Sequence, residues 1–207
     1  MHYVKKILIL LLGLLAISLA SALLMITALG GDAMTVINQG TSTFLNIDIA
    51  WGTLINNGIL FLIMLAFNRK QINIGTIGAA VLIGPFISMF MMILPDSFTD
   101  KIFINFIISL ASLVICAFGL ALYIYSSSGL GPFEGVVDIL AKKIKFKFGY
   151  SKIIMDAIFF SLGALLGGVF NVSSVISVII VGPLINLFLY LLNKTNLMTQ
   201  TNKELDD

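Results

Sequence analysis

The sequence predicts an all-α membrane protein whose six transmembrane helices form two inverted repeats of three helices each. Three observations predict this fold class: an apolar composition, six apolar runs of spanning length, and sequence landmarks that recur at a nearly constant interval. Each repeat is also expected to carry a short re-entrant or interfacial helix after its first span. We expect one transmembrane domain over residues 1–193, with repeats at about 7–94 and 102–193, and a disordered polar cytoplasmic tail over 194–207.

The composition excludes an ordinary soluble domain. Of 207 residues, 59% are hydrophobic and 11% are charged, whereas soluble domains are about 45–50% apolar and about 25% charged. No soluble fold of this length has enough interior for that apolar excess, so the bilayer is the expected solvent. The net charge of +2 gives no signal for nucleic acid. The single cysteine, Cys116, cannot form an internal disulfide and is expected to pack as a small apolar side chain.

Six apolar runs are long enough to cross about 30 Å of hydrocarbon as helices. The first run stays uncharged for longer than the core of a signal peptide, so we expect it to be retained as a span. Charged pairs, prolines or asparagine separate the runs. The predicted spans are Ile7–Leu29, Trp51–Phe67, Ile74–Leu94, Ile102–Tyr125, Ile153–Phe170 and Val172–Leu192.

The positions of the lysines and arginines predict the orientation. If the N-terminus lies in the cytoplasm, 11 of the 12 Lys and Arg residues fall on the cytoplasmic side, and Lys101 alone falls outside. The sequence therefore predicts a multi-pass protein of the bacterial inner membrane with both termini in the cytoplasm.

The two halves resemble each other at three landmarks. The matched positions, separated by 99, 98 and 97 residues, are Gly30 with Gly129, Gly84 with Gly182, and Trp51-Gly52 with Phe148-Gly149. Because each repeat has an odd number of spans, the second copy crosses the membrane in the opposite sense. Inverted repeats are common in secondary transporters. The alternative is a chance likeness between hydrophobic helices.

A short apolar segment follows each glycine turn, at Ala33–Leu45 and Pro132–Ile144. Asp32 is placed to cap the first as a helix, and Pro132, after Gly131, suits the first turn of the second. Re-entrant helices would bring their positive N-terminal ends toward the membrane centre. An interfacial amphipathic helix is the alternative, particularly for the lysine-rich second segment.

Enzyme signatures are missing from the sequence, so we expect no catalytic activity, no metal and no cofactor. The one histidine, His2, is terminal, and one cysteine with one histidine cannot form a Cys/His metal cluster. Neither a Gly-x-Ser-x-Gly motif nor a phosphate-binding loop is present.

Polar residues in apolar surroundings are the remaining candidates for a site. Asp156 either faces the protein interior or pairs at the interface with Lys152, four residues earlier. Its counterpart Asn57 serves either a solute or a partner helix. Glu134 and Asp138 share one face of the second short helix, where they bind a cation or proton or form a solvated face.

Two Gly-Pro pairs interrupt the third and sixth spans and are expected to kink them. A polar residue follows each pair, and two symmetric kinks could line a shared midplane site. A purely structural kink is the alternative. The candidate solute-site or gating residues are therefore Asp156, Asn57, Ser88, Asn186, Gly30, Asp32, Gly129, Gly131, Pro132, Glu134, Gly84, Pro85, Gly182 and Pro183.

The chain resembles the YczE/YyaS/YitT group of bacterial integral membrane proteins over roughly residues 5–192. The resemblance rests on Gly75-Thr76 followed by Ile83-Gly84-Pro85-Phe86-Ile87-Ser88, and more loosely on Gly30–Met34. Ala33 and Met34 replace the proline and aromatic residue of that group, and Ser88 stands where it often has an acid. The resemblance implies a membrane protein and carries over no catalytic residue.

The architecture predicts a small transporter or permease-like protein, because inverted repeats supply inward-open and outward-open states. The expected partners are the lipid bilayer, a small-molecule solute and a second copy in a homodimer, with no nucleic acid. Two alternatives stay open: a non-transporting scaffold or assembly factor, and a substrate-binding subunit of a larger importer.

Overall fold

The computed structural model describes residues 2–95, 101–146 and 148–195, and every regular element in them is a helix. Lys147 and the predicted tail from residue 196 lie outside these residues. The all-α prediction is therefore confirmed for this part of the chain. In chain order the elements are α1 (His2–Thr27), α2 (Ala33–Leu45), α3 (Ile49–Phe67), the single-turn η1 (Arg69–Gln71), α4 (Ile74–Ile93), α5 (Ile102–Tyr125), α6 (Pro132–Ile144), α7 (Phe148–Leu165) and α8 (Val172–Lys194).

Five helices in the described part of the chain are long and apolar enough to cross a membrane: α1, α3, α4, α5 and α8. The helix α7 is not among them; it has 18 residues and includes Lys152 and Asp156. The predicted bounds of α2, α5 and α6 are confirmed. The predicted span Ile153–Phe170 is wrong at both ends, because α7 begins at Phe148 and the chain turns after Leu165, where Gly167 has a φ of +95°.

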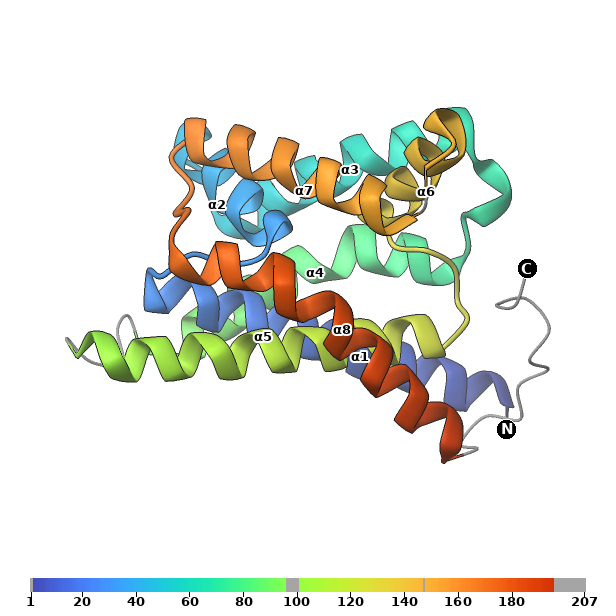
Figure 1. Ribbon diagram of the computed structural model, residues 1–207, viewed down its shortest axis with the longest axis horizontal. Coiled ribbons are helices and arrows are strands. Elements are labelled where there is room, and N and C mark those ends of the chain that lie inside the picture. The colour runs from blue at the N-terminus through green and yellow to red at the C-terminus, as the bar shows by residue number, and fades with distance from the viewer. Residues whose placement is uncertain (1, 96–100, 147, 196–207) are drawn as a thin grey trace.

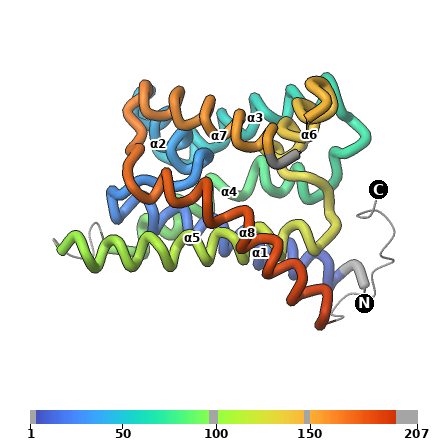
Figure 2. Tube along the Cα trace, viewed as in Figure 1, coloured from blue at the N-terminus to red at the C-terminus, as the bar shows by residue number. Residues whose placement is uncertain are grey.

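The helices form two groups, and the two halves of the chain pack extensively on each other (Figure 1). Helix α1 packs along α5, α2 against α7, and α3 against α6, while α4 packs on α1 and α8 packs on α5. Helices α2, α3, α6 and α7 lie in the upper part of the view, with α1 and α5 below. The trace in Figure 2 shows that α1 begins and α8 ends at the same end of the molecule.

Matching contacts hold the two glycine turns in place. Gly30 and Gly129 both have a positive φ, at +84° and +107°. A β-carbon at Gly30 would lie 2.8 Å from the backbone nitrogen of Asn171, and one at Gly129 would lie 2.7 Å from the β-carbon of Asn73. Asn73 and Asn171 each begin a helix, α4 and α8, with the same capping box. Each glycine turn is therefore seated on the first turn of a helix from the other half.

Glycines also allow helices from the two halves to approach closely. At the crossing of α1 and α5, a β-carbon at Gly119 would lie 2.8 Å from the backbone nitrogen of Ile17, and one at Gly13 would lie 2.9 Å from the carbonyl oxygen of Gly119. At the crossing of α2 and α7, a β-carbon at Gly163 would lie 2.8 Å from the backbone nitrogen of Ile37. Backbone-to-backbone packing of this kind is typical of helices within membranes.

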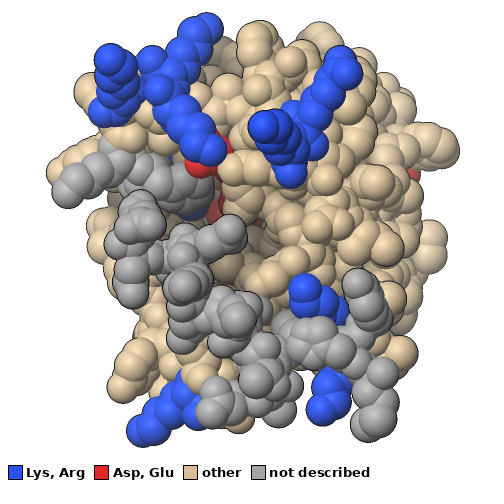
Figure 3. Space-filling view, turned by 90° about the vertical axis from the view of Figure 1, so that its right-hand side faces the viewer, with Lys and Arg blue, Asp and Glu red and all other residues tan. Residues whose placement is uncertain are grey.

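The surface separates charge from apolar side chains. Large apolar side chains are exposed along the long helices, among them Trp51 at 62% and Met92 at 83%, as expected where lipid rather than water is the solvent. Lys and Arg gather instead at the end where α1 begins and α8 ends, and acidic atoms are visible within a hollow on that face (Figure 3).

Candidate functional site

A cavity of about 80 Å³ lies between the two halves of the chain and is lined by residues from α1 to α8 or their caps. Its walls are largely apolar, from residues such as Leu14, Ile83 and Val181. The polar and charged side chains that reach it are few and come from both halves. They include Asp32, Asn38, Asn57, Glu134, Lys152 and Asp156.

The N-terminal ends of the two short helices bring two carboxylates to this cavity. Pro132 occupies the first turn of α6 as predicted, and Glu134 follows in the same turn. Asp32 is at the N-cap position of α2, but the prediction that it caps the helix is wrong in one respect. Its side chain makes no cap hydrogen bond with the backbone and instead accepts one from the Thr35 hydroxyl group. Both carboxylates thus lie where the helix dipoles favour negative charge.

Burial and nearby charges shift the pKa of the Glu134 carboxyl group. Burial raises the pKa of its carboxyl group above the ordinary value, because the charged form loses hydration. A backbone hydrogen bond and the positive charge of Lys152 lower this pKa, whereas the carboxylates of Asp32 and Asp156 raise it. These four ionisable side chains, from α2, α6 and α7, therefore form one interacting group.

Lys152 and Asp156 form an ion pair on α7. The Lys152 Nζ atom lies 2.7 Å from Asp156 Oδ2, and the two side chains are 31% and 7% exposed. The same Nζ atom lies 5.6 Å from the centre of the Phe133 ring on α6. The sequence left two alternatives for Asp156, an interior position or a pair with Lys152. The pair is present, and both of its members also line the cavity.

The two adjacent amides of α3 point to different partners. Asn56 donates from Nδ2 to Asn38 Oδ1 at 2.9 Å and to Thr41 Oγ1 at 3.1 Å, which ties α3 to α2. Asn57 is 3% exposed, lines the cavity and donates a 3.5 Å hydrogen bond to the Ala79 carbonyl oxygen of α4. Asn56 is therefore structural, and Asn57 is the amide available to a ligand.

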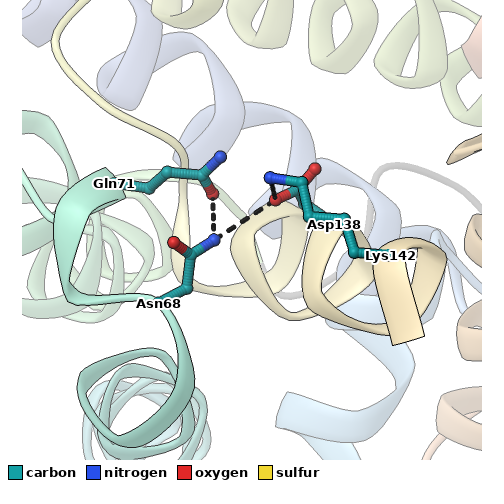
Figure 4. Close-up of polar contacts among 4 residues, drawn as sticks. All are labelled: Asn68, Gln71, Asp138 and Lys142. Atoms are coloured by element: carbon teal, nitrogen blue, oxygen red, sulfur yellow. Dashed lines mark hydrogen bonds and ion pairs between the residues drawn. The ribbon is translucent and has the colours of Figure 1, made fainter.

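Glu134 and Asp138 share one face of α6, but only Glu134 lines the cavity. Asp138 is paired with Lys142 at 2.7 Å and accepts a 3.2 Å hydrogen bond from Asn68, which also donates to Gln71 at 2.6 Å (Figure 4). This network joins α6 to the connection between α3 and α4. Asp138 does not line the cavity and forms the solvated face that the sequence left as an alternative.

The structure brings some of the predicted site residues together and leaves others apart. Asp156, Asn57, Asp32, Gly131, Pro132 and Glu134 line the cavity. Gly30 and Gly129 are in the turns that precede α2 and α6, and neither lines the cavity. The residues of the Gly-Pro segments, Gly84, Pro85, Ser88, Gly182, Pro183 and Asn186, are also outside its lining.

The sequence did not identify two polar residues that the structure places at the cavity or between helices. Asn38 lines the cavity from α2, and its signal was an amide that directly follows the apolar Val36 and Ile37. Asp48 precedes α3, accepts a 2.8 Å hydrogen bond from the backbone of Ala50 and accepts another from the Ser88 hydroxyl group. A carboxylate just before a predicted span is typical of a helix cap, but nothing local indicated Ser88 as a partner.

Comparison with known proteins gives a family and a relative. The family of unknown function DUF6198 matches residues 4–190. An uncharacterized protein from Haemophilus influenzae is 25% identical over 185 residues, which are 89% of this chain and 84% of the relative. No solved structure matches the chain. Because the family match extends over most of its length, this chain belongs to the DUF6198 family of unknown function.

Proposed function

We propose that the protein is a small secondary transporter that binds a cationic solute in the cavity between its two halves. The observation that carries the proposal is the convergence of rare charged side chains on one apolar-walled cavity. Ionisable residues inside a membrane protein are expensive to bury and commonly mark a solute or ion pathway. The remaining prediction of a homodimer, and the resemblance to the YczE/YyaS/YitT group, stay predictions.

The charge balance of the cavity favours a positive solute. Three carboxylates and one ammonium group line it, and Lys152 is already paired with Asp156. Asp32 and Glu134 are then left without a full positive charge opposite them, apart from the partial charge of the helix ends. A small amine bound between them would supply that charge, while the apolar walls would hold its carbon atoms.

The architecture proposed for this transporter is an inverted repeat with six crossings, α7 being the crossing with charged residues. The matched glycine turns, capping boxes and contacts between halves support it. The gathering of Lys and Arg at one end supports placing that end in the cytoplasm (Figure 3). Helices α2 and α6 would then enter the membrane from opposite sides, with their N-terminal ends at the cavity.

The topology has a direct test. Reporter fusions after Gly31 and after Leu130 are expected to lie on opposite sides of the membrane, because three crossings separate them. An alkaline phosphatase fusion should be active at the first position and inactive at the second, and a green fluorescent protein fusion should behave in the reverse way. If both positions report the same side, the inverted arrangement and the transporter proposal lose their support.

Binding is expected to follow the charge of the ligand. At about one hundred times its dissociation constant, a small amine should raise the Tm of the purified protein by about 5 °C. Carboxylate and uncharged compounds of similar size should leave it unchanged. Glu134→Gln and Asp32→Asn should each reduce the shift caused by the amine.

Asp138→Asn is the matched control, because this carboxylate lies outside the cavity on the same helix as Glu134. It should retain the amine response. A shift produced by anions, or one that Asp138→Asn also abolishes, would contradict the assignment. If no compound class shifts the Tm, the scaffold alternative gains weight.

A further inference from the structure

A second cleft adjoins the central cavity between α7 and α8. It has a volume of about 420 Å³, and its walls include Tyr150 and Ile153 of α7 with Val178 and Gly182 of α8. Three further residues, Lys152, Asp156 and Ser177, line both this cleft and the central cavity. The cleft therefore leads to the ion pair. Its α7 residues lie in the first turns of that helix, and its α8 residues lie in the first half of α8.

The corresponding helices of the first half, α3 and α4, are packed together instead. A β-carbon at Gly84 would lie 2.6 Å from the carbonyl oxygen of Ala50, so the two backbones are in direct contact. One turn further along α4, the Ser88 hydroxyl group donates a hydrogen bond to the Asp48 carboxylate at the start of α3. We name these two contacts, Gly84 with Ala50 and Ser88 with Asp48, the α3–α4 latch.

The same two positions of α8 have no such contacts. A β-carbon at Gly182, 98 positions after Gly84, would meet no atom within 4 Å. Asn186, 98 positions after Ser88, is exposed, and no hydrogen bond joins its side chain to another described residue. Along their described lengths, α7 and α8 make few contacts with each other. The Gly-Pro segment is thus packed against the neighbouring helix in the first half and is open in the second.

We propose that the α3–α4 latch is a closed gate on one side of the central cavity and that the α7–α8 cleft is the matching gate in its open state. This inference rests on the proposed transport function and deepens it by assigning the two gates. In the alternate state Gly182 packs on the first turns of α7, while the α3–α4 latch opens. The glycines before Pro85 and Pro183 permit each close approach, because a larger residue would hold the backbones apart.

The gates predict opposite effects of one substitution at two equivalent positions. Gly84→Ala places a β-carbon against Ala50 and disfavours the state seen here, so the alternate state becomes more populated. Gly182→Ala adds a β-carbon where there is open space, so it is compatible with this state and disfavours the alternate one. Gly182→Ala is therefore the matched control, with the same residue type beside the same proline.

Cross-linking across the cleft reports which state is populated. Tyr150→Cys and Val178→Cys place one thiol on each wall, and a short bifunctional reagent joins them faster when the cleft closes. The joined peptides are identified by mass spectrometry, so buried Cys116 stays in place. Gly84→Ala is expected to raise the cross-linking rate by about tenfold. Gly182→Ala is expected to lower it or leave it at the wild-type level.

A second pair of variants covers the case in which Gly84→Ala fails to fold. Ser88→Ala removes one contact of the latch and should raise the rate by about threefold, whereas Asn186→Ala should leave it unchanged. Equal effects within both pairs, or a lower rate for Ser88→Ala, would overturn the inference. The amine-induced change in Tm is measured separately, so a failure of ligand binding is distinguishable from a failure of the gates.

Discussion

Gly119→Leu is expected to lower the free energy of unfolding by about 3 kcal/mol or more, the largest effect of any single substitution considered for this chain. A β-carbon at this position would already lie 2.8 Å from the Ile17 backbone nitrogen and 3.0 Å from the Gly13 carbonyl oxygen. Because backbone cannot move aside as a side chain can, the whole α1–α5 crossing must separate. The crossing joins the two halves, so its loss weakens the entire assembly.

The measurement is the thermal unfolding midpoint of the purified protein in one detergent, which should fall by about 10 °C. Gly58→Leu is the control, because a β-carbon at Gly58 of α3 would meet nothing within 4 Å. This variant should unfold within about 2 °C of the wild type. Equal losses in the two variants would mean that the α1–α5 crossing is not closely packed.

Lys152→Met is expected to lower the free energy of unfolding by about 3 kcal/mol, because it leaves the Asp156 carboxylate buried without its partner. The carboxylate is 7% exposed and lies 2.7 Å from the Lys152 ammonium group, which itself is 31% exposed. The substitution also makes the cavity more negative. Thermal unfolding in detergent measures the effect.

The double variant Lys152→Met with Asp156→Leu tests whether the loss of stability comes from the unpaired Asp156 carboxylate. Replacing both charges by apolar groups of similar size removes the uncompensated carboxylate, so most of the stability should return. The double variant should retain amine binding, because Asp32 and Glu134 are unchanged. A double variant no more stable than Lys152→Met alone would show that the ion pair is not the source of the loss.

Local sequence signals were enough to predict most helix bounds. The bounds of α2, α5 and α6 follow from glycine turns, Pro132 and the apolar run after Lys101. The error at α7 has a local cause as well: apolar residues continue from Leu165 to Phe170, but Gly167 turns the chain before they can extend the helix. Hydrophobicity alone could not reveal that turn.

The site was predicted only in part. A charged or polar residue in an apolar helix is costly to bury and is therefore recognisable in the sequence, but the sequence does not identify its neighbours in space. Asp156 and Asn57 were recognisable as polar groups in apolar helices. The contact between Ser88 and Asp48 joins residues 40 positions apart and depends on how α3 and α4 pack. The difference between the two Gly-Pro segments was also unpredictable, since the same Gly-Pro pair is packed in α4 and open in α8.

The α3–α4 latch has an optical consequence. Trp51 is the one tryptophan of the sequence, lies in the first turn of α3 and donates a 3.0 Å backbone hydrogen bond to Asp48, the residue that holds Ser88. Its indole ring is largely exposed, so its emission wavelength depends on the polarity of whatever surrounds the start of α3. The native protein therefore carries an intrinsic fluorophore beside the α3–α4 latch. Its emission can report the opening of this latch without an attached dye.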